Sequence, residues 1–222
     1  MRIVVVVGAA GRGGDEAARR SCQEALADAQ VVWRGLDQDS LGRCDAVVVV
    51  ADAPTPPAIA APLRAFAERG APVLGLGGGF RLLTRIGLLD GSFVDEGAAR
   101  AEVAEVHLLV EGRPTPFTFA LPAGRILRLP WDGSAGRYQH LEPDALEREA
   151  RVVLRHADAS GGRSERANPH GATAAIAGIT NAAGNVVGLA PAALAPVASA
   201  PHDGRLFFAS LLLHLGGRGG RV

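Results

Sequence analysis

The chain has 222 residues, enough for one α/β domain with a decorated edge but scarcely for two domains. Acidic and basic residues number 23 each, so the molecule has no net charge that would attract nucleic acid or an anionic membrane. The 23 basic residues are all arginines, which excludes a Schiff-base lysine and the lysine of a Walker phosphate-binding loop.

The first half of the chain alternates short apolar runs with helical patterns. Residues 3–7 are a β-branched run closed by Gly8, which is typical of a strand buried on both faces of a parallel sheet. Further strands are expected at residues 31–33, 45–50 and 72–76, and helices at residues 15–29, 59–70 and 80–86. The fourth strand leads directly into Gly77-Gly78-Gly79, and at such a turn α/β enzymes place a nucleophile or bind an anion.

The second half reads as strands separated by turns, closed by an apolar helix at residues 203–215. The expected strands are residues 106–110, 117–121, 126–129, 152–154, 174–179 and 186–189. Several of them should join the sheet in antiparallel fashion. We predict a single domain over residues 1–222, with a tail that frays after about residue 216.

Glycines after the first strand offer a rival interpretation of the chain. Gly8, Gly11 and Gly14 match a variant of the dinucleotide-binding turn, and Asp37 lies where a ribose-binding carboxylate would be expected. The simpler interpretation is that glycine allows a tight turn after a strand. In a chain with 29 glycines we favour that interpretation.

Reactive side chains are sparse. Cys22 falls on an apolar helical stripe and Cys44 directly precedes a buried strand, so both are interpreted as small core residues. The six histidines lack the spacing of a zinc site, and we expect neither a metal nor a cofactor. Two histidines lie in apolar segments, His107 and His214. The other four are expected in polar loops: His140, His156, His170 and His202.

Two groups of arginines are interpreted as solvated surfaces. They are Arg81 with Arg85, and Arg148 with Arg151 and Arg155. An anion held by the backbone N–H groups of Gly78 and Gly79 would have Arg81 as the nearest side chain to assist. The sequence therefore allows a weak anion site at the glycine turn.

Five ordered blocks resemble one family. Residues 70–93, G-A-P-V-L-G-L-G-G-G-F-R-L-L-T-R-I-G-L-L-D-G-S-F, are similar to the nucleophile region of the small glutaminase subunit of phosphoribosylformylglycinamidine synthase, the PurQ family of class I glutamine amidotransferases. The other blocks are V-H-L-L-V-E-G-R-P-T-P-F-T (106–118), A-N-P-H-G (167–171), I-A-G-I-T-N-A-A-G-N-V-V-G-L-A-P (176–191) and D-G-R-L-F-F-A-S (203–210). The resemblance implies a flavodoxin-like three-layer α/β/α fold, with a mostly parallel central sheet and antiparallel additions.

The resemblance also implies a catalytic site, and four parts of it are missing. The family's turn reads Gly-x-Cys-x-Gly, in which the thiolate attacks the glutamine amide, whereas this chain has Gly77 at that position. The family's activating His and orienting Glu correspond to Ala192 and Leu194. Asp52 lies in the segment that replaces the oxyanion loop, where its carboxylate would repel a developing oxyanion. The family's His-Gly-Glu-Gly run is replaced by W-D-G-S-A-G. The vestigial positions are therefore Gly77, Gly78, Asp52, Ala192 and Leu194.

Loss of a triad nucleophile or base typically lowers the rate by about 10⁶-fold, so we expect negligible glutaminase activity. The resemblance implies two partners, a large ATP-dependent synthase subunit and a small accessory subunit, and a homo-oligomer is also compatible with the sequence. We expect no nucleic-acid or membrane partner. Because the chain has neither a signal-peptide pattern nor a run of about 18 apolar residues, we expect it in the cytoplasm. The alternative function is a small-molecule sensor or an enzyme that uses the emptied pocket.

Overall fold

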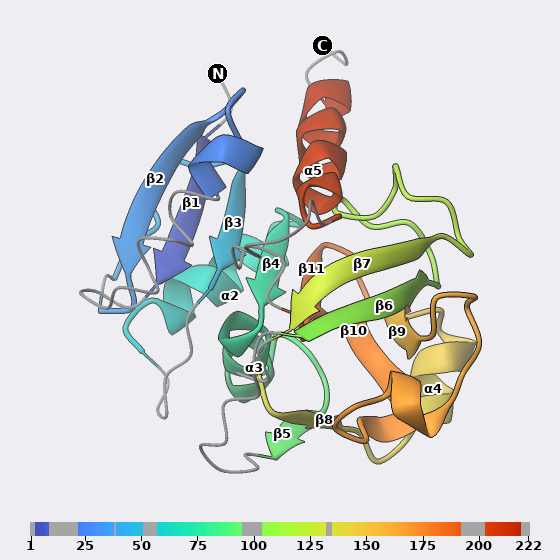
Figure 1. Cartoon of the computed structure of the whole chain (residues 1–222). Coiled ribbons are helices and arrows are strands. Elements are labelled where there is room, and N and C mark those ends of the chain that lie inside the picture. The colour runs from blue at the N-terminus through green and yellow to red at the C-terminus, as the bar shows by residue number, and fades with distance from the viewer. Residues whose placement is uncertain are drawn as a thin grey trace.

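The computed structural model describes residues 3–8, 22–37, 39–50, 57–94, 104–131, 135–191 and 203–218. Nine strands form one sheet in the order β2-β1-β3-β4-β11-β10-β9-β6-β7, and β5 pairs with β8 in a separate two-stranded sheet (Figure 1). Neighbouring strands are parallel from β2 to β11 and antiparallel from β11 to β7.

The parallel half of the sheet is built from the short apolar runs. Its strands are β1 (Ile3–Gly8), β2 (Gln30–Gly35), β3 (Ala46–Val49), β4 (Val73–Leu76) and β11 (Val186–Leu189). Every residue of β3, β4 and β11 is buried, as expected for strands covered on both faces. The spatial order of the five strands is that of a flavodoxin-like sheet, which confirms the predicted fold class.

The antiparallel half extends the sheet through β10 (Ile176–Thr180), β9 (Val152–Ala157), β6 (Ala104–Val110) and β7 (Ile126–Trp131). β7 is the edge strand, and its outer side is blocked. The backbone N–H of Arg128 donates to the Asp203 carboxylate at 2.8 Å, and the Asp203 N–H donates to the Arg128 carbonyl at 2.9 Å. Pro130 offers no N–H. These features prevent another strand from pairing along β7.

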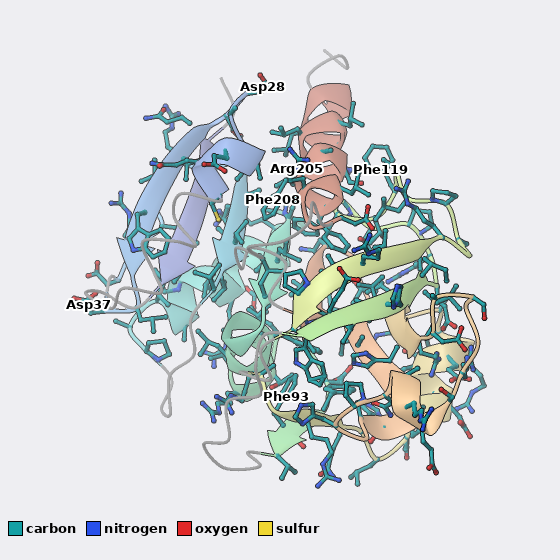
Figure 2. All side chains as sticks on the ribbon, viewed as in Figure 1. Asp28, Asp37, Phe93, Phe119, Arg205 and Phe208 are labelled. Atoms are coloured by element: carbon teal, nitrogen blue, oxygen red, sulfur yellow. The ribbon has the colours of Figure 1, made fainter. Side chains whose placement is uncertain are left out.

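Helices cover both faces of the sheet. α2 (Ala60–Glu68), α3 (Gly78–Arg85) and α4 (Pro143–Arg148) contribute to one core. α5 (Arg205–Arg218) and the helical residues 22–25 contribute to the other, in which Phe208 of α5 is fully buried (Figure 2). Successive side chains of β3 alternate between the two cores, so the sheet is the middle layer of three.

The expected strand at residues 117–121 is wrong. These residues form turns, because the hydroxyl of Thr118 accepts from the backbone N–H of Thr115 at 3.1 Å and the Thr115 hydroxyl accepts from the N–H of Phe117 at 3.3 Å. Such local side-chain bonds satisfy backbone donors that a ladder would otherwise use. Pro114 and Pro116 also remove two donors at the start of the segment.

Other differences concern the extent of elements. β10 begins at Ile176, since residues 173–175 form a 3₁₀ turn, η2 (Thr173–Ala175). α5 continues to Arg218, three residues beyond the expected end of the last helix at residue 215. The expected helix over residues 15–29 is described only from residue 22 onward. Four short elements were not predicted: β5 (Ser92–Val94), β8 (Arg137–Gln139), α4 and the 3₁₀ turn η1 (Glu165–Ala167). Among the described helices, none has the length and apolar character needed to cross a bilayer.

Candidate functional site

One edge of the sheet collects the ends of several strands. β3, β4 and β11 are parallel, and the antiparallel pairings make β9 and β7 run in the same direction as β11. The carboxyl ends of these five strands therefore lie along the same end of the sheet. We call this end the elbow edge. In open α/β sheets, ligands bind at this edge.

The turn from β4 into α3 has an unusual backbone at Gly77. Its φ of 53° and ψ of −117° lie outside the regions that L-residues adopt without strain. The Gly77 N–H donates to the Leu189 carbonyl of β11 at 2.9 Å, and the Gly77 carbonyl accepts from the Phe80 N–H at 3.0 Å. This sharp turn has the strand-to-helix arrangement of a nucleophile elbow, as the sequence predicts.

Close packing explains why the turn keeps its other glycines. A Cβ on Gly79 would lie 2.0 Å from the Val49 carbonyl oxygen of β3, and one on Gly75 would lie 2.6 Å from the Leu83 side chain. The first of these contacts is with backbone, which cannot move aside. The start of α3 is thus pressed against β3, and this contact is independent of any nucleophile.

Phe80 packs α3 against β11 and against the β5-β8 pair. A Cβ on Gly188 of β11 would lie 2.0 Å from the Phe80 ring, so the ring rests directly on the strand backbone. Phe80 also meets Phe93 edge-on, with centroids 4.8 Å apart, and stacks on Tyr138 at 5.3 Å. Phe93 lies on β5, at the end of the molecule that carries this small sheet (Figure 2). The aromatic cluster of Phe80, Phe93 and Tyr138 therefore fixes the elbow helix between β11 and the β5-β8 pair.

The predicted anion site lies at the start of α3, where the structure describes all three of its residues. Gly78 and Gly79 open α3, and Arg81 lies half-buried in its first turn with a guanidinium nitrogen close to Gly136. Arg85, one turn further, is exposed. The geometry brings the three predicted residues together at the helix start.

Several predicted positions lie outside the described residues. They are Asp52, Ala192, Leu194, Gly11, Gly14 and His202. The described chain after β11 ends at Pro191, directly before the two positions that correspond to the family's base and orienting acid.

Neither cysteine is an activated thiol. Burial raises the pKa of Cys22 to about 12. Burial and the nearby Asp45 raise that of Cys44 to about 11, against opposing effects of Arg69 and Arg34. Both side chains are therefore neutral thiols at pH 7. Cys22 is fully buried in the core, as predicted, whereas Cys44 is only half-buried.

The first-strand glycine has a packing role. A Cβ on Gly8 would lie 2.2 Å from the Trp33 ring, so Gly8 makes room for that ring. Asp37 is exposed in the turn after β2 (Figure 2). This favours the interpretation of Gly8 as a structural glycine.

His156 was expected in a loop and lies instead in β9, 2% exposed. Its ring faces Trp131 of β7, with centroids 5.4 Å apart, and His170 approaches the same indole at 4.3 Å. Burial, together with His170, lowers the pKa of His156 to about 4. Among the described residues, His156 Nδ1 and Trp131 Nε1 have no hydrogen-bond partner. The elbow edge thus holds a neutral buried imidazole that periodicity could not reveal.

The interpretation of Arg151 and Arg155 as solvated surface is wrong. Arg155 is 2% exposed and donates to Glu111 at 2.9 Å, to Glu147 at 2.8 Å and to the Ala174 carbonyl. The Arg151 side chain is 12% exposed and pairs with Asp90 and Glu149. Only Arg148 of this group is exposed. These arginines link β9 to α4 and to neighbouring loops, which is a structural role.

No three His, Cys, Asp or Glu side chains of the described ranges gather as a metal site would require.

Comparisons with known proteins agree on one family. Residues 37–197 match the model of the CobB/CobQ-like glutamine amidotransferase domain. Among curated relatives, the phosphoribosylformylglycinamidine synthase subunit PurQ of Symbiobacterium thermophilum is 41% identical over 164 residues, 71% of this chain and 68% of that protein. PurQ of Rhodopseudomonas palustris is 38% identical over 192 residues, 85% of this chain and 80% of that protein.

Solved structures of related proteins have the same fold as this chain. A chain in the structure of PurLQS from Thermotoga maritima superposes with a TM-score of 0.74 at 27% identity, covering 96% of this chain and 99% of that one. The glutaminase domain of Trypanosoma brucei CTPS, solved with bound acivicin, gives a TM-score of 0.60 at 11% identity, covering 98% of this chain and 94% of that one. The second likeness concerns the fold alone.

Proposed function

Since this chain belongs to the CobB/CobQ-like glutamine amidotransferase family and has PurQ as its homologue, we propose that it is a PurQ-like protein of purine biosynthesis that no longer hydrolyses glutamine. Its role is that of a non-catalytic subunit or paralogue of phosphoribosylformylglycinamidine synthase, acting in the cytoplasm as one folded domain. The observation that carries the proposal is the Gly77 turn, which has the backbone of an elbow and no side chain to attack with.

The sequence and the described groups near the turn support this loss of chemistry. A glutaminase of this type needs a nucleophile, a base that removes its proton and donors that stabilise the oxyanion. Gly77 lacks the first, and the sequence has Ala192 and Leu194 where the family has its base and orienting acid. The raised pKa values of both cysteines argue against a substitute thiolate. Loss of a nucleophile alone costs about 10⁶-fold in rate, which places residual turnover below detection.

The retained elbow is consistent with a docking role. The glycines and the aromatic cluster keep α3 in place for packing reasons that do not involve catalysis. A partner that recognises the surface around the elbow would therefore still meet the same shape. A large synthase subunit that accepts free ammonia could work beside such a subunit.

The test combines assembly with nitrogen source. The chain is co-expressed with the large and small synthase subunits of the same cell, and complex formation is followed by size-exclusion chromatography with light scattering. We expect a complex whose synthase activity is supported by ammonium but not by glutamine. Glutamine-supported activity would contradict the loss of hydrolysis, and the absence of a complex would contradict the docking role. The large subunit alone, supplied with ammonium, is the control for both outcomes.

A second candidate is a sensor that binds a small anion in the emptied pocket. It is supported by the placement of Arg81 in the first turn of α3 beside Gly78 and Gly79. A thermal-shift titration with phosphate and with glutamate tests it, because a ligand that binds only the folded state raises Tm with concentration. Arg81→Gln should remove the shift. An unchanged Tm in the wild-type protein, or an equal shift in the variant, would exclude this candidate.

A further inference from the structure

A groove lies at the edge of the sheet opposite the elbow. It has a volume of about 480 Å³ and lies between the segment after β6, the β10-β11 turn and α5. The lining residues that carry the argument are Arg113, Pro114, Pro116, Phe119, Gly184 and His214. We call it the Arg113 groove. Its volume falls in the range of about 300–1,000 Å³ that is usual for ligand pockets.

The Arg113 groove presents apolar surface to solvent. Phe119 is 44% exposed and meets His214 of α5 at a centroid distance of 6.0 Å, and Leu213 beside His214 is 60% exposed. Figure 2 shows Phe119 next to α5. Two of the three large exposed hydrophobic side chains of the described residues therefore lie at this end of the molecule. Exposed aromatic and aliphatic side chains gathered in this way mark interaction surfaces.

The exposure of Phe119 is imposed by a rigid turn. Its backbone N–H donates to the Thr115 carbonyl at 2.9 Å, and the hydroxyls of Thr115 and Thr118 are 2.8 Å apart. Phe117, two residues earlier, points into the core and is fully buried. The turn therefore uses one phenylalanine to hold itself in place and presents the other. A preformed contact surface binds with a smaller loss of conformational entropy.

Arg113 gives the groove a positive charge, and its hydrogen-bond partners are neutral backbone carbonyls. Its Nη2 donates to the Asn181 carbonyl at 3.0 Å and to the Ala182 carbonyl, so both partners are neutral. No carboxylate among the described residues forms an ion pair with Arg113, and the lining of the groove contains no Asp or Glu. Its buried Nε–H is without a hydrogen-bond partner in the same part of the chain. A guanidinium paired only with neutral carbonyls favours an anionic oxygen as a further partner.

We propose that the Arg113 groove docks a segment of a partner polypeptide in which a carboxylate stands next to an apolar side chain. The apolar side chain packs on Phe119 and on the exposed Pro114, and the carboxylate pairs with Arg113. Arginine and aromatic residues are the types that most often dominate binding at protein interfaces. The groove lies at the amino end of β4 and β11, so this partner is bound away from the elbow edge.

The minimal probe is N-acetyl-L-phenylalanine, which carries an apolar ring and a carboxylate, and its control is N-acetyl-L-phenylalaninamide, which lacks the charge. Binding to the full chain is followed by ¹H-¹⁵N chemical-shift changes. We expect the acid to shift the amides of Gly184, Asn185 and Phe119. The amide control should bind at least about tenfold more weakly, since only the acid forms a charge-assisted hydrogen bond with Arg113. Equal binding of the two probes, or no shifts at millimolar concentration, would overturn the proposal.

Two variants distinguish the groove from other surfaces. Arg113→Gln should abolish the preference for the acid, and Phe119→Ser should weaken both probes. Because Arg113 also supports the β10-β11 turn, Phe119→Ser provides the independent readout should Arg113→Gln unfold. N-acetyl-Glu-Phe-amide then separates a side-chain carboxylate from a chain terminus as the source of the charge. Unchanged probe binding in Phe119→Ser would place the contact elsewhere and end the proposal.

Discussion

The elbow edge and the Arg113 groove lie at opposite ends of the strands and differ in what they offer a ligand or partner. At the elbow edge, the backbone of a nucleophile turn persists while its reacting side chain is absent. At the opposite edge, the Arg113 groove presents an aromatic ring and a charge that the fold itself does not need to expose. The difference teaches that packing alone is enough to hold the backbone geometry of the elbow, whether or not it carries a reacting side chain. Exposed side chains have no such protection, so their presence points more directly to a current use.

The largest expected effect is a difference in stability between substitutions of a buried and an exposed phenylalanine in the turn beside the groove. Phe117→Ala should destabilise the protein by about 3–5 kcal/mol, because it empties a fully buried site. Phe119→Ala should cost less than about 1 kcal/mol, because the ring is 44% exposed. Urea midpoints of the two variants measure the difference, provided that the slope m is unchanged. Equal losses would mean that Phe119 is a folding residue and that the contrast between the edges is mistaken.

A comparable loss of folding stability is expected at the elbow edge when a side chain clashes with the backbone. Gly79→Ala places a methyl group about 2 Å from the Val49 carbonyl oxygen and should cost about 3 kcal/mol or more. Gly217→Ala in α5 is the matched control, since its Cβ meets no atom within 4 Å and alanine favours a helix. The control should raise the unfolding midpoint slightly. A Gly79→Ala variant as stable as the wild type would show that packing does not hold the elbow.

Restoring the thiol separates geometry from chemistry directly. Gly77→Cys should lose about 1–3 kcal/mol of stability because a side chain is strained at φ 53°. Glutamate release by this variant should stay at background, because the sequence supplies no base to activate the thiol. Gly77→Ala carries the same strain without sulfur and is the control. Hydrolysis by the cysteine variant above that of the alanine variant would reveal a base that we have not recognised.

The buried imidazole of His156 predicts how stability depends on pH. Its folded-state pKa of about 4 lies below the value of about 6.5 in an unfolded chain, so the unfolded state binds more protons between these values. Folding should therefore weaken as pH falls from 7 to 5, by about 2 kcal/mol from this residue alone. In His156→Leu this part of the slope should disappear.

Denaturant titrations at pH 5, 6 and 7 provide the measurement. A slope that is the same in His156→Leu and in the wild type would mean that the ring is hydrated in solution.

Much of the fold could be predicted because buried parallel strands need apolar residues on both faces. The runs at Val47–Val49 and Val73–Leu76 therefore indicate strands without ambiguity. The segment at Phe117 is also mainly apolar but contains Thr118, and it forms turns, since the Thr115 and Thr118 hydroxyls bond the local backbone. β5 and β8 were missed because each is three residues long, too short for a period to be recognised.

The elbow and the Arg113 groove also differ in how far the sequence could predict them. The elbow could be predicted because its residues are contiguous in the sequence, from Gly75 to Arg81. The Arg113 groove could not, because residues that are far apart in the sequence meet there only after folding. The strand expected at residues 152–154 stops short of His156, whereas β9 continues to Ala157. The side chain of the preceding Arg155 is buried among carboxylates.

The most direct test of the central claim is glutamine hydrolysis by the wild-type chain, measured as glutamate released with and without the large synthase subunit. We predict a rate indistinguishable from that of the Cys22→Ala/Cys44→Ala double variant and from buffer. Turnover above background, or a covalent glutamyl adduct on any side chain, would contradict the account and show that another group of the chain serves as the nucleophile.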